Sequence, residues 1–417
     1  MKYFFALSLF FVGFVPGISG QQIKKLDGSL ISKTAIDKTI KHLMDTADVT
    51  GLNIAIINDN KVVYIKSFGY KNVLNGELID TATCFYGASF SKAVFSYLVM
   101  QLVQDGIIDL DKPIYKYLDK PLPEFEEYKN LSIDDRWKLI TAMHCLNHST
   151  GFPNWRNFNP KGNRKLEIFF TPGSRYAYSG EGLLLLQMVI EKNTGKKLED
   201  LAREKVFAPL KMTRTSYQWQ SSFENNFAVG YYENIPQQRS KRKSANAAGS
   251  LETTIADYSR FIAAVMQGKG LTQMSKQEMI SPQIPIHSKR QFPSLNSDTT
   301  SVNKKIQLSY GLGWGVFKDQ FGKAFFKEGH DDGWGHYNVN YPDKKYSIIL
   351  MSNSSNGECI FQETIETIAG KTGIPWEWEG YTPYRGSIKM NEGELNQYVG
   401  VYEMEKVELP CRSMGIN

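Results

Sequence analysis

The sequence predicts an α/β (α+β) protein: an antiparallel sheet flanked by helices, with a mostly helical region inserted between its strands. Strand-like runs lie near both ends of the 417-residue chain, at 52–65 and again at 310–351. Between them lie apolar runs, the first over Ala93–Val103. Strands at both chain ends with helices between them are typical of one sheet that distant segments complete and helices cover on each face.

The first twenty residues predict a secretory signal peptide. Lys2 precedes an apolar run from Phe4 to Val15, and small residues follow before Gln21. The run is too short for a membrane-spanning helix, so we expect an exported, periplasmic or secreted protein without a stable membrane span. A retained N-terminal anchor is the alternative. The formal net charge of +6 is mild for this length and does not favour a nucleic-acid partner.

Four cysteines are present, and they lie far apart in the chain: Cys84, Cys145, Cys359 and Cys411. In an exported protein they allow three disulfide connectivities, but they are too few and too scattered to form a disulfide scaffold. We therefore expect buried free thiols.

Two strand-like runs, 52–57 and 62–65, flank the polar segment Asn58–Lys61 and predict a β-hairpin. Near the other end, four runs predict an antiparallel meander: Tyr310–Val316, Ala324–Lys327, Tyr337–Tyr341 and Tyr346–Met351. A helix over Cys359–Ala369 is expected to close it.

The middle of the chain is expected to hold helices at Leu183–Lys192 and Ala256–Gln267. The stretch from 206 to 254 is interpreted as loop. Residues 282–305 are polar and rich in Pro, Ser and Asn, which predicts a mobile loop.

The run Gly87-Ala88-Ser89-Phe90-Ser91-Lys92 opens the helix at 93–103. Ser89 and Lys92 are three residues apart, so a helix places them on one face, where the amine can take the serine proton. A lysine among apolar groups is shifted toward its neutral form, which a base requires. The helix N-terminus favours the alkoxide and then the oxyanion. The alternative is an N-cap serine followed by a surface lysine.

The Ser-x-x-Lys pattern alone is weak, because it occurs twice more, at Ser240/Lys243 and Ser301/Lys304. Both of these pairs lie in polar stretches that offer no apolar wall to desolvate the lysine. We interpret them as solvated loop charges.

Two further patterns imitate functional motifs. His144, Cys145 and His148 have metal-ligand spacing, but no carboxylate or third ligand is indicated nearby, so structural histidines are expected and no metal site. The segment Asn147–Gly151 resembles a Gly-x-Ser-x-Gly elbow around Ser149, but no strand precedes it. It is interpreted as a helix end and turn.

Three motifs in order resemble the serine β-lactamase and penicillin-binding-protein superfamily, in particular the branch of class C β-lactamases, D-stereospecific peptidases and related esterases. Ser89-Phe90-Ser91-Lys92 matches the first motif, Ser-x-x-Lys. Tyr178-Ser179-Gly180 matches the second, which is Tyr-x-Asn in most members. Lys327-Glu328-Gly329 matches the third, Lys-Thr-Gly or His-x-Gly; the alternative, His330-Asp331-Asp332, needs a gap and lacks the glycine.

The resemblance covers roughly residues 35–372 and implies a β-lactamase/transpeptidase-like fold for a hydrolase domain at 21–375. Residues 376–417 are a tail in which 395–403 resembles the opening strand of an appended β-domain. The tail is too short for a complete barrel, which leaves a remnant domain or a truncated reading frame as alternatives.

The resemblance also implies a role for each site residue. Ser89 is the nucleophile, Lys92 activates it with Tyr178 as proton relay, and Lys327 keeps Tyr178 acidic and meets polar groups of the substrate. The backbone N–H groups of Ser89 and His330 form the oxyanion hole. No metal or organic cofactor is implied.

The resemblance implies three substrate-binding positions, Gly180, Glu328 and Gly329, and the first two depart from the family. Gly180 replaces an asparagine that contacts the first lysine and the acyl side chain of the substrate. Glu328 replaces a small hydroxyl residue that helps to hold a carboxylate, so its negative charge is expected to repel one. Both changes put β-lactam turnover in doubt.

The function that follows is an exported serine hydrolase acting through an acyl-enzyme. Its substrate is a small-molecule or peptide ester or amide: a small acyl ester, a D-amino-acid peptide, a β-lactam or another cell-wall-derived compound. Esterase or D-stereospecific peptidase activity is favoured over β-lactamase activity. The alternative is a non-catalytic or slowly turning over penicillin-binding or cell-wall sensor module with the same fold. A structural envelope protein is disfavoured by the three ordered motifs.

Overall fold

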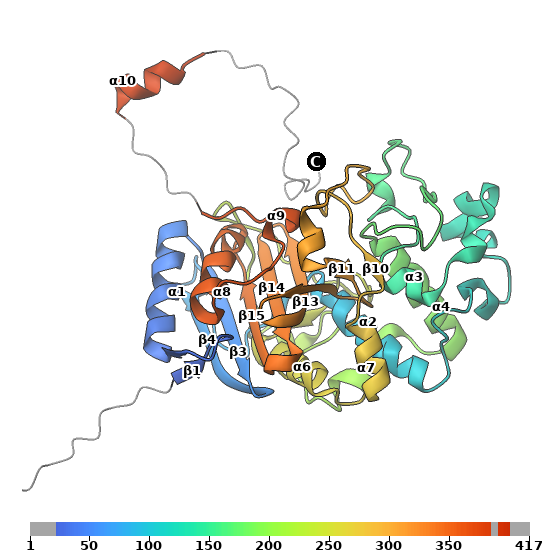
Figure 1. Cartoon of the computed structure of the whole chain (residues 1–417), viewed down its shortest axis with the longest axis horizontal. Helices are drawn as coiled ribbons and strands as arrows, with labels where there is room; N and C mark the ends of the chain where they lie inside the picture. The colour runs from blue at the N-terminus through green and yellow to red at the C-terminus, as the bar shows by residue number, and fades with distance from the viewer. Residues whose placement is uncertain (1–21, 385–390, 401–417) are drawn as a thin grey trace, which may run out of the picture.

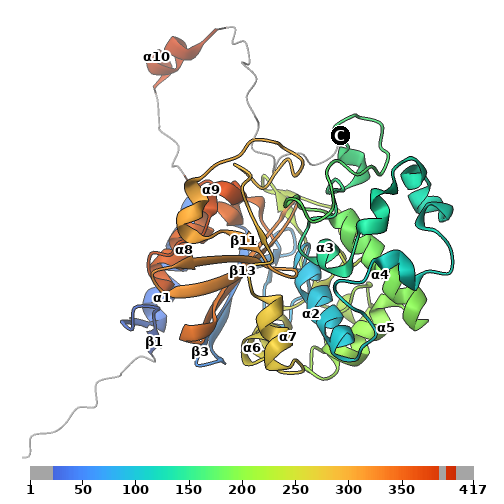
Figure 2. The same cartoon turned by 45° about the vertical axis from the view of Figure 1, so that its right-hand side comes forward.

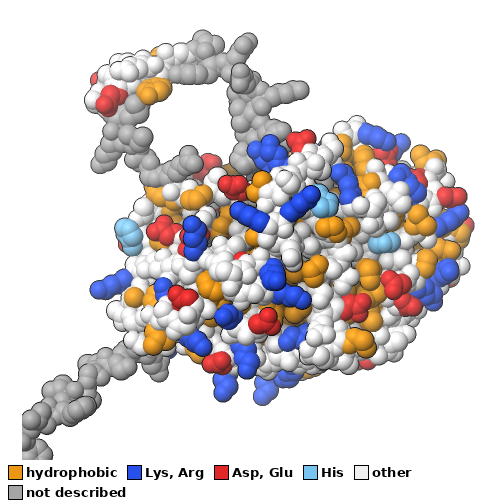
Figure 3. Space-filling view, viewed as in Figure 1, with side chains coloured by type: hydrophobic (Ala, Val, Ile, Leu, Met, Phe, Trp, Pro, Cys, Tyr) orange, Lys and Arg blue, Asp and Glu red, His pale blue; other side chains and the backbone are white. Residues whose placement is uncertain are grey.

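The computed structural model describes residues 22–384 and 391–400 of the chain (Figure 1). The predicted signal peptide, residues 1–20, and Cys411 lie outside the described residues. Within the described part, no helix is both long and apolar enough to cross a membrane. On the face in Figure 3, basic side chains are interspersed with acidic ones, in keeping with the mild net charge.

A nine-stranded sheet forms the centre of the molecule, in the order β10-β11-β12-β13-β14-β15-β3-β4-β5. Its strands, in chain order, are β3 (Gly51–Asn58), β4 (Lys61–Asn72), β5 (Glu77–Leu78), β10 (Ile284–Pro285), β11 (Ser309–Tyr310), β12 (Gly315–Asp319), β13 (Gly322–Asp331), β14 (Trp334–Tyr341) and β15 (Tyr346–Ser352). All neighbours are antiparallel, and β15 pairs with β3 so that Ile348 faces Ile56. The expected hairpin, the last three runs of the meander and the joining of distant segments in one sheet are confirmed. The first run, Tyr310–Val316, is not one strand, because it holds the end of β11, a bend and the start of β12.

The central strands are buried on both faces. In β15, Ile348 and Leu350 belong to one apolar core, whereas Ile349 and Met351 belong to the other. Successive side chains of a strand point to opposite faces, so an unbroken apolar run places one core on each side of the sheet.

Helices cover both faces, with a separate helical region at one end (Figure 1). They are α1 (Lys33–Ala47), α2 (Phe90–Gln104), α3 (Ala142–Leu146), α4 (Gly180–Thr194), α5 (Leu198–Ala202), α6 (Ile255–Gln267), α7 (Gln273–Met279), α8 (Phe361–Ala369), α9 (Trp376–Glu379) and α10 (Glu392–Leu395). Helices α1 and α8 pack against one face and α6 against the other. Helix α2 lies between the sheet and α3–α5 (Figure 2). This layered α/β architecture confirms the predicted fold class.

Helix α2 begins three residues earlier than the expected Ala93–Val103 run. It is buried on nearly all sides, including at Ser91 and Lys92. An apolar surface all round the helix gives no amphipathic stripe, which is the pattern of a helix inside a domain. The chain leaves the helix through Gly106, whose φ of +70° suits glycine.

Several shorter elements differ from the expectation. The stretch 206–254 is not all loop, because it contains the strand β9 (Glu252–Thr253), which pairs with β6 (Phe85–Tyr86) just before Ser89. It also contains the hairpin of β7 (Tyr231–Tyr232) and β8 (Ile235–Pro236). Two-residue strands carry no alternation that a sequence pattern can reveal.

Cys84 and Cys145 are buried and free, as expected, and Cys359 is free but half-buried. Near the end of the described chain, Trp376, Trp378 and Tyr381 pack into the core beside α8. The described part of the stretch 395–403 is a helical turn, Asn396–Tyr398, that follows α10.

Candidate active site

The predicted site residues converge on a cleft of about 790 Å³ between the start of α2, the strand β13 and the loops at 154–160 and 291–297. Ser89, Lys92, Tyr178, Glu328 and His330 all line it. They come from three segments of the chain, at 89–92, 178 and 328–330, so the fold itself assembles the site.

Ser89 sits on a sharp turn between β6 and α2. The preceding Ala88 has a φ of +44°, in the left-handed region that non-glycine residues rarely occupy. Such strain persists only where the surrounding structure fixes it, and it is concentrated at functional sites. Within the described chain the Ser89 hydroxyl caps no N–H group of α2, so the N-cap alternative is wrong.

Lys92 is only 1% exposed, and its amine lies 2.9 Å from the Ser89 hydroxyl. The same amine donates a hydrogen bond to the Ala248 carbonyl at 2.6 Å. Burial, and then the nearby charge of Lys327, holds the pKa of Lys92 well below its usual value. A neutral amine in contact with a serine hydroxyl has the geometry of a general base and its nucleophile.

Tyr178 completes the group. Its ring lies 4.8 Å from the Lys92 amine, and its hydroxyl accepts a hydrogen bond from Lys327 at 3.2 Å. Burial, and then the negative charge of Glu328, raises the pKa of Tyr178 well above its usual value. This direction contradicts the expectation that Lys327 keeps Tyr178 acidic, because burial, and then the charge of Glu328, favours the protonated hydroxyl. Tyr178 is poised to act as a protonated hydroxyl.

Glu328 points into the site but its charge is paired. Its carboxylate lies 2.8 Å from the Lys327 amine and accepts a hydrogen bond from Gln291 at 3.1 Å. Burial opposes ionisation, but the Lys327 charge lowers the pKa of the Glu328 carboxyl. Because its charge is paired, Glu328 should repel a substrate carboxylate less strongly than the sequence led us to expect. Its effect is to occupy Lys327, a cation that would otherwise be available to a substrate carboxylate.

Gly329 lets β13 approach the turn before Ser89. A Cβ at Gly329 would lie 3.0 Å from the Gly87 carbonyl oxygen, so a side chain would force the two segments apart. The next residue, His330, turns its imidazole toward Glu358, with Nδ1 2.8 Å from the carboxylate. This placement fits the register Lys327-Glu328-Gly329, in which the backbone of His330 and not its ring serves the site.

The two patterns that imitate a metal site and a nucleophile elbow form structural hydrogen bonds instead. His144 shares a capping box with Thr141, and His148 Nδ1 accepts a hydrogen bond from the Ser179 N–H at 3.2 Å. In the described part of the chain, no three His, Cys, Asp or Glu residues gather as a metal site. Ser149 is fully buried and donates to Asn147, at the end of α3 as expected.

Trp155 is a cleft residue that sequence reasoning missed. An ideal Cβ on Gly180 would come within 2.5 to 2.9 Å of three carbon atoms of the Trp155 ring. The indole therefore fills the space into which a residue-180 side chain would project. Gly180 indicated that space is left at this position, but no pattern in the sequence indicated that Trp155 fills it.

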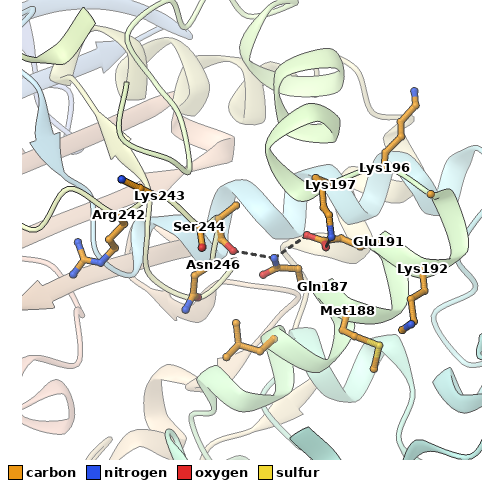
Figure 4. Close-up of a pocket in the computed structure, with 13 residues that line it drawn as sticks. Gln187, Met188, Glu191, Lys192, Lys196, Lys197, Arg242, Lys243, Ser244 and Asn246 are labelled. Atoms are coloured by element: carbon orange, nitrogen blue, oxygen red, sulfur yellow. Dashed lines mark hydrogen bonds and ion pairs between the residues drawn. The ribbon is translucent and has the colours of Figure 1, made fainter. Parts of the chain in front are cut away.

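A second missed residue, Gln187 on α4, holds the loop that carries Ala248. Gln187 donates to the Ala245 carbonyl at 3.0 Å and accepts from the Ala247 N–H at 2.8 Å. It lies in a separate surface cavity of about 710 Å³ beside Glu191, Lys196 and the loop (Figure 4). Gln187 thus holds the residues just before Ala248, whose carbonyl accepts from Lys92.

Replacing Gln187 by leucine is expected to lower kcat about tenfold and leave KM within about twofold, because a displaced Ala248 carbonyl misplaces the base but not the substrate. Steady-state kinetics on an activated ester measures this split. Lys196→Ala, in the same cavity but bonded to Glu204 rather than to the loop, should retain the wild-type kcat. Equal kcat values for Gln187→Leu and wild type would contradict the assignment.

Comparisons with known proteins identify relatives of the chain in sequence and in fold. A family model described as Beta-lactamase matches residues 36–369. A penicillin-binding protein of Bacillus subtilis is 24% identical over 70% of this chain and 65% of its own length, and a β-lactamase of Yersinia enterocolitica is 21% identical over 77% and 87%. The chain spans less than two thirds of the length of several such relatives. The structure of an octameric penicillin-binding protein homologue from Pyrococcus abyssi superposes with a TM-score of 0.65 at 21% identity, covering 84% of this chain and 79% of that one.

Proposed function

The chain belongs to the Beta-lactamase family, and from this we propose that it is an exported serine hydrolase that cleaves an ester or amide through an acyl-enzyme. The hydrolase domain is 21–375, and export rests on the signal-peptide pattern of residues 1–20. The observation that carries the proposal is the buried Lys92 amine 2.9 Å from the Ser89 hydroxyl. A desolvated amine beside a serine at a helix N-terminus has few structural uses and a direct chemical one.

In the proposed first half-reaction, Lys92 removes the proton from the Ser89 hydroxyl as its oxygen attacks the carbonyl carbon. The negative charge on the carbonyl oxygen is stabilised by the backbone N–H groups of Ser89 and His330. The Tyr178 hydroxyl then gives its proton to the leaving group and regains one from Lys92. The acyl group is left on Ser89.

In the second half-reaction, a water molecule replaces the leaving group. Lys92 takes one proton of the water, directly or relayed through the Tyr178 hydroxyl, as the water oxygen attacks the acyl carbon. Lys92 then returns this proton to the Ser89 oxygen as the acyl–Ser89 bond breaks. Lys327, held by Glu328, keeps the Tyr178 hydroxyl in place. Side chains of the chain make every proton transfer in this scheme, so it calls for no metal or organic cofactor.

We expect p-nitrophenyl butyrate to be hydrolysed faster than nitrocefin. The acylamido group of a β-lactam loses a hydrogen-bond partner here, because Gly180 has no side-chain amide. The carboxylate of a β-lactam loses its partner because Lys327 is paired with Glu328. A missing hydrogen bond of this kind costs about 0.5–1.5 kcal/mol, and simple acyl esters need neither contact. The test is a turnover panel of p-nitrophenyl acetate and butyrate, nitrocefin and a D-alanyl-D-alanine peptide. A rate on nitrocefin higher than that on p-nitrophenyl butyrate would contradict this preference and indicate a β-lactamase.

A second candidate is a sensor that acylates without turnover. The observation that favours it is the Trp155 ring in place of an amide at position 180, because the lost polar contact weakens the hold on substrate and water. A fluorescent penicillin label that persists, together with no hydrolysis of any ester in the panel, would identify the sensor.

A further inference from the structure

One wall of the cleft is an aromatic surface that begins at Trp155. The ring lies where a side chain on residue 180 would project, and its centroid is 5.9 Å from the Lys92 amine. Trp155 therefore lies beside Lys92 in the wall of the cleft, close to where a reacting carbonyl would be placed.

The apolar surface continues outward from this ring on two loops. Its further members are Phe158, Pro160, Phe292, Pro293 and Leu295. Phe158 is 45% exposed although it lines the cleft. An apolar side chain that faces a concave site and stays uncovered is characteristic of a ligand pocket and not of a core.

Both loops are fixed in place by charged side chains that do not enter the chemistry. Arg156 pairs with the buried Glu181 at 2.7 Å, which holds the loop of Trp155 and Phe158 to α4. Arg175 donates to the backbone carbonyls of the 291–297 loop, at Leu295 and Asn296, each at 3.2 Å. Contacts within the chain thus hold both loops of the apolar wall in place without a ligand.

The charged groups in and around the cleft are largely paired with one another, which does not favour an anionic substrate. Of the described residues that line it, Lys92 is the one lysine or arginine, whereas Glu328, Asp331 and Asp332 are acidic. Lys92 is already bonded to Ser89 and to the Ala248 carbonyl. The nearest other cations, Lys327 and Arg242, lie beside Glu328 and Asp331, so a substrate carboxylate would compete with acidic partners already there, whereas an uncharged alkyl chain meets a matching surface.

We propose that Trp155, with Phe158 and Leu295, binds the acyl group of the substrate and selects esters whose acyl group is an uncharged alkyl chain of medium length. The inference rests on the proposed function, because it assigns the substrate class of the same Ser89 site. Each methylene group that the wall removes from water should raise kcat/KM about fourfold, or about a hundredfold or more from acetate to hexanoate.

The test is kcat/KM for p-nitrophenyl acetate, butyrate, hexanoate and octanoate, measured on the wild type and on Trp155→Ala, Trp155→Phe and Trp219→Ala. We expect a steep rise to hexanoate in the wild type, a rise of less than about twofold per methylene in Trp155→Ala, and an intermediate slope in Trp155→Phe. Trp219, which is partly buried but outside the cleft, is the matched control and its variant should keep the wild-type slope. Comparing slopes within each variant separates specificity from losses of folded protein.

Two results distinguish this inference from the proposed function. If a fluorophosphonate labels Ser89 and acetate is cleaved, but the slope is flat in the wild type or unchanged in Trp155→Ala and Trp155→Phe, the acyl wall is overturned and the hydrolase stands. If no ester is cleaved and Ser89 takes no label, the proposed function fails, and the acyl wall with it.

Discussion

Ser89→Ala is expected to abolish hydrolysis of every substrate, by about 10³-fold or more, because the mechanism has no other nucleophile. The hydroxyl is the group that Lys92 contacts at 2.9 Å, and removal of one atom leaves the rest of the cleft in place. Steady-state rates on p-nitrophenyl butyrate measure the loss. Treatment of the wild type with a fluorophosphonate should add one label, which peptide mapping by mass spectrometry should place on Ser89.

Ser149→Ala is the matched control, because Ser149 belongs to the segment that imitates a nucleophile elbow. It is fully buried and its hydroxyl donates to the Asn147 side chain, so its loss should affect thermal stability more than rate. A label on Ser149, or an active Ser89→Ala protein, would contradict the assignment of the nucleophile.

The elements that sequence reasoning predicted share one property: each is a long run of residues that is either apolar at regular intervals or apolar throughout. The alternating cores of β15 and the unbroken apolar surface of α2 are of this kind. Helix α1 carries a usable stripe at Ile36, Ile40 and Leu43, and sequence reasoning missed it although the signal was there. The pair β6 and β9 is different, because two residues in each strand contain too little pattern to read.

In the site, sequence reasoning predicted the residues better than their charges. Ser89, Lys92, Tyr178 and Lys327 do meet, as three ordered motifs led us to expect. The contact between Lys327 and Glu328 was not predictable, since neighbours on a strand ordinarily point to opposite faces. The position of Trp155 was hidden for another reason: it depends on how its loop folds back on the first turn of α4, which no local pattern specifies.

Lys327→Ala is expected to lower kcat/KM about 10²-fold or more, whereas His330→Ala should cost less than about tenfold. Lys327 is fully buried and donates to the Tyr178 hydroxyl. Without Lys327 the Tyr178 hydroxyl is no longer held in position to protonate the leaving group. His330→Ala keeps the backbone N–H proposed for the oxyanion hole, although it loses the contact of the ring with Glu358. Rates of both variants on p-nitrophenyl butyrate give the ranking.

Stability has to be separated from activity in this comparison. Lys327→Ala leaves Glu328 buried without its ion-pair partner, and removal of one member of a buried pair costs about 3–5 kcal/mol. The double variant Lys327→Met, Glu328→Gln removes both charges at similar volume, so it should recover most of the melting temperature while the rate stays low. Recovery of the rate along with the melting temperature would show that Lys327 acts only through folding. A His330→Ala protein less active than Lys327→Ala would show that the third motif lies instead at His330-Asp331-Asp332, with the imidazole taking part in the chemistry.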